Sequence, residues 1–211
     1  MRNDITGIIL CGGKSSRMQT NKALLKLGNK TIVKIILEEM KKVFDVVLIS
    51  ANECDDFSSL NIPIVKDIQE NRGPLSGIYS VLKNSQTAKN FIVTCDLPLI
   101  NSEMIEYISK VDSDKEIIVP TCNGIPQRLF GLYNKSLIEK IEKIFHLSET
   151  DKSIKGSVFD LHQNANVESV EISNLNIYNE SLFINMNSPE DYEKVKSIYP
   201  VLWKHFLNIL S

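Results

Sequence analysis

Short apolar runs alternate with segments of helical periodicity along most of the chain, and this alternation limits the possible folds more than any other feature. The run 5–10 is apolar and ends in glycines, as expected of a buried strand that leads into a loop. Strands that alternate with helices predict an α/β fold of Rossmann-like type, with helices on both faces of a mostly parallel sheet. The expected strands are 5–10, 45–51, 63–67, 90–96, 116–121, 129–133, 167–172 and 183–186, and the expected helices are 31–44, 75–82, 102–110, 136–145, 153–162 and one that begins at Pro189.

Several of these helices carry recognisable start signals. Ser102 is the expected cap of helix 102–110, and Pro74 suits the first turn of helix 75–82. Ser188 followed by Pro189 and two acids predicts a further helix start. The length of 211 residues fits a single domain with room for a central sheet, and no repeat or low-complexity linker divides it.

Composition excludes several classes of function. The net charge of −2 provides no basic field for nucleic acid, and no stretch approaches the roughly 18–20 apolar residues of a membrane span. Cys11, Cys54, Cys95 and Cys122 match neither a zinc pattern nor a C-x-x-C pair, so free thiols are expected. We expect a cytoplasmic protein that binds neither nucleic acid nor a membrane.

The segment LCGGKSSRMQTNK (10–22) directly follows the first expected strand. Gly12 and Gly13 let backbone N–H groups approach an anion closely, and Arg17 and Lys22 are spaced to reach phosphate oxygens. The pattern is neither G-x-x-x-x-G-K-[ST] nor G-x-G-x-x-G. A solvated basic turn would explain this local composition equally well.

Polar residues also lie at or just after the ends of three other expected strands: Asn52, Asp67 and Asp96. Ligands of open α/β sheets bind beyond the carboxyl ends of the strands, so these side chains should meet the basic loop in one crevice. Oxygen ligands beside a phosphate-binding loop suggest Mg²⁺, which binds one or two carboxylates plus substrate phosphates. The alternatives are a helix-capping role for Asp96 and a solvated loop position for Asp67.

Taken together, the motifs resemble those of molybdenum cofactor guanylyltransferases over nearly the whole chain. The pattern G-G-x3-R-M-x3-K with CDLP (95–98) is typical of the wider nucleotidyltransferase superfamily of the sugar-nucleotide type, and GPLSGI (73–78) with NMNSPED (185–191) narrows the resemblance. It implies a single-domain nucleotidyltransferase fold over 1–211. Its parts would be a nucleotide-binding half at about 1–110, an acceptor-binding half at about 111–200 and a helical tail at 201–211.

The resemblance also implies a reaction and a set of roles. Mg-GTP and molybdopterin cofactor would give the guanine dinucleotide cofactor and pyrophosphate, with Arg17, Lys22 and Asp96 as the catalytic set. Enzymes that make or receive the cofactor are the implied protein partners. The implied nucleotide contacts are Leu10, Cys11, Gly12 and Gly13 through the loop, Lys22 to phosphate, Asn52 and Asp67 to guanosine, and Asp96 to Mg²⁺.

Four positions depart from the family pattern. Gln19 stands where glycine is usual, Asn21 where aspartate is usual and Cys11 where alanine is common, and Arg128 replaces a proline. None of these changes removes an implied ligand of metal or phosphate, but they leave room for a shifted substrate preference.

The acceptor would bind on the second half of the chain. Gln127, Asn185 and Asn187 are the candidates, although a turn or cap before Ser188 explains the two asparagines equally well. Two other functions remain open: a nucleotidyltransferase with a sugar phosphate or terpenoid precursor as acceptor, and a non-catalytic GTP-binding sensor, which Gln19 and Asn21 would favour.

Overall fold

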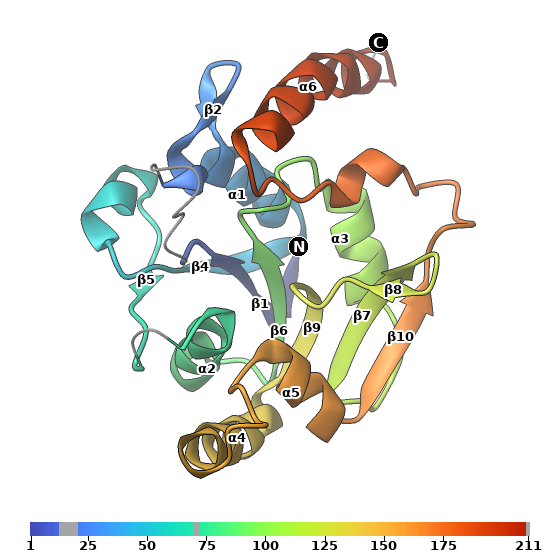
Figure 1. Ribbon diagram of the computed structural model, residues 1–211. Coiled ribbons are helices and arrows are strands. Elements are labelled where there is room, and N and C mark those ends of the chain that lie inside the picture. Colours follow the sequence, from blue (N-terminus) through green and yellow to red (C-terminus); the bar gives the residue numbers. More distant parts are fainter. Residues whose placement is uncertain (13–20, 70–71, 210–211) are drawn as a thin grey trace.

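The computed structural model describes residues 1–12, 21–69 and 72–209, and the side chains of these residues up to position 200. A central sheet lies between two layers of helices (Figure 1). The helices α1, α3 and α6 lie on one face, and α2, α4 and α5 lie on the other. The α-helices are α1 (Ile32–Val43), α2 (Pro74–Asn84), α3 (Ser102–Ser109), α4 (Ile138–Thr150), α5 (Val158–Asn164) and α6 (Pro189–Ile209).

The sheet has the strand order β10-β7-β9-β6-β1-β4-β5, with β8 paired to β7. The pairs β1–β4, β1–β6, β4–β5 and β7–β10 are parallel, whereas β9 runs antiparallel to both β6 and β7. The expected mostly parallel α/β sheet is therefore confirmed, with an antiparallel strand near its middle. The strands are β1 (Arg2–Leu10), β4 (Phe44–Ser50), β5 (Ile64–Val65), β6 (Lys89–Thr94), β7 (Ile117–Cys122), β8 (Ile125–Pro126), β9 (Phe130–Asn134) and β10 (Val167–Glu171), and β2 (Lys26–Leu27) and β3 (Lys30–Thr31) form a separate hairpin.

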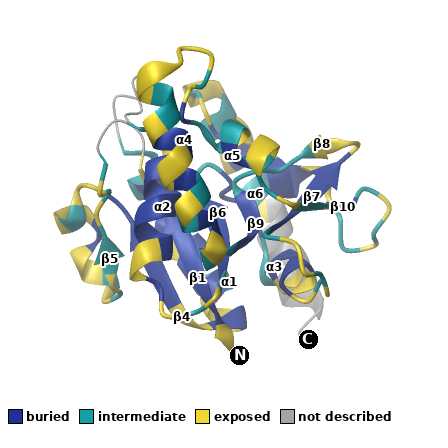
Figure 2. Ribbon diagram, turned by 90° about the horizontal axis from the view of Figure 1, so that it is seen from below, coloured by how far each residue is buried: buried dark blue, intermediate teal, exposed yellow. Residues whose placement is uncertain are grey.

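The strands bury apolar residues on both faces, as expected for a sheet that is covered on both sides. Ile8 and Ile9 are adjacent in β1 and point to opposite faces, so Ile9 joins the core beneath α1 and α3. Ile8 joins the core beneath α2, α4 and α5. Figure 2 shows the buried strands between helices whose outer surfaces are exposed.

Three local expectations differ from the structure. Asn101, not Ser102, caps α3, because the Asn101 side chain accepts the backbone N–H of Met104 at 3.0 Å. The expected strand 183–186 pairs with no other described strand, and it follows a 3₁₀ turn, η4 (Glu180–Phe183). The expected helix 153–162 begins only at Val158, where Ser157 and Asp160 form a capping box.

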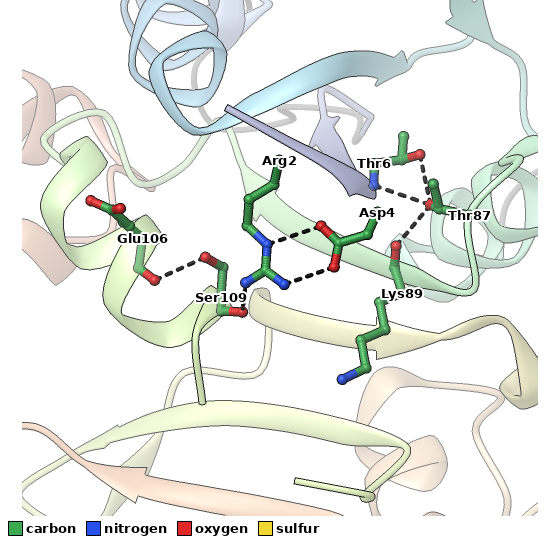
Figure 3. A network of polar contacts seen from close by, with 7 residues as sticks. All are labelled: Arg2, Asp4, Thr6, Thr87, Lys89, Glu106 and Ser109. Atoms are coloured by element: carbon green, nitrogen blue, oxygen red, sulfur yellow. Dashed lines mark hydrogen bonds and ion pairs between the residues drawn. The ribbon is translucent and has the colours of Figure 1, made fainter. Parts of the chain in front are cut away.

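A polar network fixes the amino-terminal ends of β1 and β6 (Figure 3). The Arg2 guanidinium donates to both carboxylate oxygens of Asp4, at 3.1 and 2.7 Å, and to the Ser109 carbonyl at the end of α3. The Thr87 hydroxyl accepts from the backbone N–H of Thr6 at 3.1 Å. The strands β1, β4, β5 and β6 all finish at the other end of the sheet, which is here termed the carboxyl edge. The polar network therefore lies at the end opposite to the carboxyl edge.

No helix in the described part of the chain has the length and apolar character needed to cross a bilayer. The cytoplasmic location expected from the sequence stays a prediction.

Gly131 permits the close approach of β9 to β7. Its φ of +151° is unfavourable for other residues, and a Cβ atom there would collide with the carbonyl oxygen of Ile118. Gly131 therefore holds β9 in the centre of the sheet.

We expect Gly131→Ala to lower the free energy of unfolding by about 3 kcal/mol or more, because backbone strain and overpacking add. Gly28→Ala is the matched control: Gly28 also has positive φ, but no described atom outside its own chain neighbourhood lies within 4 Å of a Cβ there. That control should cost about 1 kcal/mol. Urea unfolding measures both values, and equal losses would contradict the proposed collision.

Candidate active site

The carboxyl edge brings the expected strand ends together. Leu10 is in register with Ser50 on one side and with Thr94 on the other. The pairing extends one residue further, because the Cys11 N–H donates to the Ser50 carbonyl at 2.8 Å and the Cys95 N–H donates to the Leu10 carbonyl at 3.0 Å. The loops that follow these strands, which include Asn52 and Asp96, therefore start at the same edge of the sheet.

Lys22 is the centre of the first polar cluster. Its Nζ lies 3.1 Å from Asp96 Oδ1 and 3.0 Å from Asn187 Oδ1. The side chains of Lys22 and Asp96 are only 13% and 29% exposed, so the ion pair is partly shielded from water. Lys22 begins the 3₁₀ helix η1 (Lys22–Leu24), Asp96 follows β6, and Asn187 precedes α6. Three distant segments thus place a cation, a carboxylate and an amide in one cluster.

Asn187 is held in this cluster by the start of α6. The backbone N–H groups of Asn187 and Ser188 donate to the Asp191 carboxylate at 2.9 and 2.8 Å, and these bonds hold the pKa of Asp191 below its usual value. The Ser188 hydroxyl caps the helix by accepting from the Asp191 N–H. The expected helix start is confirmed. Since Ser188 is the cap, the Asn187 side chain is free to bind Lys22.

Asp96 does not cap a helix, because α3 is capped by Asn101. The backbone carbonyl of Asp96 instead accepts from the Met186 N–H at 2.9 Å. This bond joins the segment before α6 to the loop after β6. It explains why residues 184–187 are placed beside the carboxyl edge without forming a strand of the sheet.

Asn52 and Asp67 form a second cluster at the ends of β4 and β5. The Asn52 side-chain oxygen Oδ1 accepts from the Asp67 backbone N–H at 3.0 Å, and the side-chain Nδ2 donates to Asp67 Oδ2 at 3.3 Å. The Ser50 hydroxyl donates to Asp67 Oδ1 at 3.4 Å. The two residues expected to contact the nucleoside therefore lie together, and Ser50 joins them.

Gly77 lets α2 approach this second cluster. A Cβ atom on Gly77 would lie 2.9 Å from the Ser50 hydroxyl and 3.6 Å from Asp67 Oδ1. Sequence reasoning singled out neither Ser50 nor Gly77 as a site residue. A glycine inside the helical stretch GPLSGI was the available signal, because a helix-interior glycine usually has a packing or functional reason.

The loop after β1 is described only at its start. Leu10 and Cys11 are buried, and Gly12 is exposed. The hydrogen bond with the Cys95 thiol, and then burial, hold the pKa of Cys11 well above its usual value, which disfavours the thiolate form. The expectations for Gly13, Arg17 and Gln19 lie outside the described residues. All four cysteines are free, as expected.

Asn21 has a physical reason to differ from the usual aspartate. Its side-chain oxygen accepts from the Ala23 N–H at 3.2 Å and caps η1, while its amide donates to Asp56 Oδ2 at 3.1 Å. An aspartate could accept the first bond, but it would repel the Asp56 carboxylate. The substitution leaves the contacts of Lys22 with Asp96 and Asn187 in place.

The acceptor candidates divide between two places. Asn185 and Asn187 are exposed and flank the buried Met186, as alternating residues of an extended segment do. Gln127 lies in the turn between β8 and β9, where its N–H donates to the Pro120 carbonyl at 2.9 Å. The structure brings Asn187 into contact with Lys22 and places Gln127 next to Arg128.

A lysine-centred polar cluster and a second polar cluster, both at the carboxyl edge of an α/β sheet, fit the place where such sheets bind their ligands. A model of the MobA-like NTP transferase domain matches residues 7–164, and the chain belongs to this family.

Relatives and solved structures agree with this membership. Probable molybdenum cofactor guanylyltransferases from Carboxydothermus hydrogenoformans and Pelotomaculum thermopropionicum are each 33% identical to the chain. The first comparison covers 93% of this chain and 97% of the relative, and the second covers 90% and 91%. The crystal structure of molybdopterin-guanine dinucleotide biosynthesis protein A from Archaeoglobus fulgidus has a TM-score of 0.76 at 18% identity, covering 92% of this chain and 98% of that one. It therefore shares the fold.

We expect Gly77→Ala to raise KM for the nucleotide about tenfold, which corresponds to about 1.4 kcal/mol. The added methyl group would displace the Ser50 hydroxyl and with it Asp67. Because the methyl group would contact Ser50 and Asp67 of the second cluster and not Lys22, kcat at saturating nucleotide should change little. Steady-state kinetics with varied nucleotide measures both constants, and an unchanged KM would remove this cluster from nucleotide binding.

Proposed function

We propose that the chain transfers GMP from Mg-GTP to the molybdopterin cofactor, giving the guanine dinucleotide cofactor and pyrophosphate. The observation that carries the proposal is the position of Lys22 between Asp96 and Asn187 at the carboxyl edge. Full-length relatives named as probable molybdenum cofactor guanylyltransferases support the choice of nucleotide and acceptor. Residues of about 1–110 would bind the nucleotide, and those of about 111–200 would bind the acceptor.

In this reaction the terminal phosphate of the acceptor attacks the α-phosphorus of GTP. Such a transfer depends on positioning and on charge neutralisation more than on a nucleophilic side chain. A lysine ammonium has three N–H donors, and the bonds to Asp96 and Asn187 occupy two of them. The third donor can bind a phosphate oxygen, and its partly buried position strengthens that bond. Lys22 would thus stabilise charge that moves onto the leaving pyrophosphate.

Asp96 fits the role of a magnesium ligand. Its Oδ1 binds Lys22, and within the described residues no donor is bonded to Oδ2, which leaves one carboxylate oxygen for a cation. The described residues contain no group of three or more His, Cys, Asp or Glu side chains that could hold a metal ion by themselves. A single carboxylate suits Mg²⁺ that arrives with nucleotide phosphates. The ion would neutralise the phosphates when bound.

Asn52 and Asp67 would contact the guanosine, together with backbone groups at Leu10, Cys11 and Gly12. Asp67 already accepts hydrogen bonds from Asn52 and Ser50, so its carboxylate is fixed in position before a nucleoside arrives. A carboxylate of this kind can accept from hydroxyl or amino donors of a guanosine. Such prior ordering reduces the entropy lost on binding.

The geometry supports catalysis over a GTP-binding sensor. Gln19 and Asn21 motivated the sensor: the Asn21 side chain is accommodated by Asp56 beside an intact Lys22 cluster, and Gln19 lies outside the described residues. A nucleotidyltransferase with another phosphorylated acceptor would use the same phosphate-binding cluster. The dependence of the reaction rate on the base of the NTP and on the acceptor distinguishes it from a molybdenum cofactor guanylyltransferase.

We expect kcat/KM for GTP to exceed those for ATP and CTP by at least about 10²-fold, or roughly 2.7 kcal/mol. Guanine offers an N1–H and a 2-amino donor beside an O6 acceptor, and a site that pairs these groups rejects bases that leave its own polar groups unpaired. Pyrophosphate release from each of four NTPs, with and without molybdopterin cofactor, tests the proposal. Comparable rates with CTP, or release that is independent of the acceptor, would contradict guanylyl transfer to this acceptor.

We expect Asp96→Ala to abolish transfer while the fold stays intact, because the substitution removes both the metal ligand and the partner of Lys22. Asp4→Ala is the matched control, since it removes a paired carboxylate at the opposite end of β1. Circular dichroism checks the fold and pyrophosphate release checks turnover. Near-normal turnover of the Asp96 variant would exclude this carboxylate from the mechanism.

We expect Lys22→Ala to lower kcat by roughly 10²–10³, the scale of losing one preorganised charge-stabilising donor. Lys22→Arg should restore only part of the rate, because a planar guanidinium replaces a compact ammonium between Asp96 and Asn187. An alanine variant with unchanged rate and unchanged nucleotide affinity would show that Lys22 acts only as a solvated surface lysine.

A further inference from the structure

Arg128 lies at the carboxyl edge, on the β9 side of β6. The antiparallel pairing places Phe130, the first residue of β9, opposite Val93 near the end of β6. Arg128 stands two residues before Phe130, in a turn closed by a 3.0 Å bond from the Phe130 N–H to the Gln127 carbonyl. Because β9 runs against β6, the chain that enters β9 is at the edge where β6 ends and leads to Asp96.

Among the described residues, the Arg128 side chain has an aromatic neighbour but no carboxylate as an ion-pair partner. Its Cζ lies 5.2 Å from the centroid of the Phe159 ring in α5. Its Nε is shielded from solvent and has no hydrogen-bond partner among the described residues. No carboxylate of the described residues forms an ion pair with Arg128. A buried donor without a partner costs free energy, and the described residues supply no partner for Nε.

The other two described arginines, Arg2 and Arg72, each form an ion pair with a carboxylate. Arg72 also lies over a phenylalanine, 5.6 Å from the Phe145 centroid, but it donates to the Ser148 hydroxyl at 2.6 Å and to Glu149 at 2.8 Å. Arg2 binds both carboxylate oxygens of Asp4. Arg128 differs from Arg2 and Arg72 in having only the stacking contact, and this difference sets it apart as a candidate ligand for an anion.

Two titratable residues close to Arg128, Tyr133 and His162, do not supply a negative charge. The Tyr133 hydroxyl donates to the Arg128 carbonyl and lies 2.8 Å from His162 Nε2. Burial raises the pKa of Tyr133 far above its usual value, so the phenol stays protonated. Burial, and then the charge of Arg128, lower the pKa of His162 to about 4, so this imidazole is neutral near pH 7. The Arg128 charge is therefore not compensated by these two neighbours.

We propose that Arg128 binds the terminal phosphate of the acceptor and orients it for attack, an inference that rests on the proposed function. The contact with Phe159 helps to position the guanidinium, and no described residue accepts a hydrogen bond from its two terminal nitrogens, whose N–H groups match two phosphate oxygens. A phosphate could also come from the nucleotide. The acceptor is favoured because Arg128 lies beside β9, whereas Asn52 and Asp67 lie on the other side of β6, at the ends of β4 and β5.

Kinetics with both substrates varied tests the proposal. Arg128→Ala should raise KM for the molybdopterin cofactor by at least about tenfold and leave KM for GTP within about twofold. Arg128→Lys should recover part of the loss, because it restores the charge without the bidentate edge. Arg72→Ala is the matched control, with a stacked arginine whose charge is already paired, and neither KM should move. An unchanged KM for the cofactor, or an equal rise for GTP, would overturn the assignment.

A binding measurement separates this inference from the proposed function. Inorganic phosphate is titrated calorimetrically into the wild-type chain, the Arg128→Ala variant and the Arg72→Ala variant, each saturated with a non-hydrolysable GTP analogue. Phosphate should bind the wild type and the Arg72 variant equally and the Arg128 variant at least about tenfold more weakly. Equal binding to all three, or no binding to the wild type, would overturn the anion site. Failure of the proposed function would appear instead as a wild-type chain that releases no pyrophosphate with the cofactor.

Discussion

The contact of Lys22 with Asp96 and Asn187 is the interaction on which the rest of the site depends. Asp96 is 74 residues and Asn187 is 165 residues from Lys22 along the chain. The ammonium therefore joins the segment after the basic loop, the end of β6 and the start of α6. Because the pair with Asp96 is partly buried, Lys22 is held by charge and by two directed hydrogen bonds.

In the proposed reaction, the direction of the strands would place the two substrates on different sides of β6. On one side of β6, the parallel strands β1, β4 and β5 end at the carboxyl edge and place Asn52 and Asp67 there. On the other side, β9 is antiparallel, so its beginning lies at the same edge and brings Gln127 and Arg128 with it. Gly131 makes this arrangement possible by letting β9 lie close to β7. A reaction that joins a nucleotide to a second phosphorylated molecule can use both sides of such an edge.

The sequence predicted the features that local periodicity encodes. Apolar runs and helical repeats identified β1, β4, β6, α1 and α2, and the motif residues at the strand ends followed from the rule for parallel sheets. The cap of α3 was misplaced because Asn101 and Ser102 are both good capping residues. Residues 183–186 read as a strand because they are short and apolar, but their backbone bonds to the Asp96 loop instead.

Local periodicity could not predict the contacts between segments that are distant in the sequence. The approach of α2 to Ser50 through Gly77, the bond of Asn187 to Lys22 and the absence of a described acidic partner for Arg128 appear only when the sheet order is known. Asn21 is a further example. As a departure from the family pattern it favoured a non-catalytic GTP-binding sensor, whereas its hydrogen bond to Asp56 explains why an asparagine replaces the usual aspartate.

The most direct test of the account is a double-mutant cycle in kcat/KM with Lys22→Ala, Asn187→Ala and the double variant. If the two side chains act as one centre, Asn187→Ala alone lowers kcat/KM about tenfold or more. The double variant then falls within about threefold of Lys22→Ala, because residues that act as a unit are strongly non-additive. Losses that multiply in the double variant, or an Asn187 variant with full activity, would contradict the claim that the Lys22 cluster is the catalytic centre.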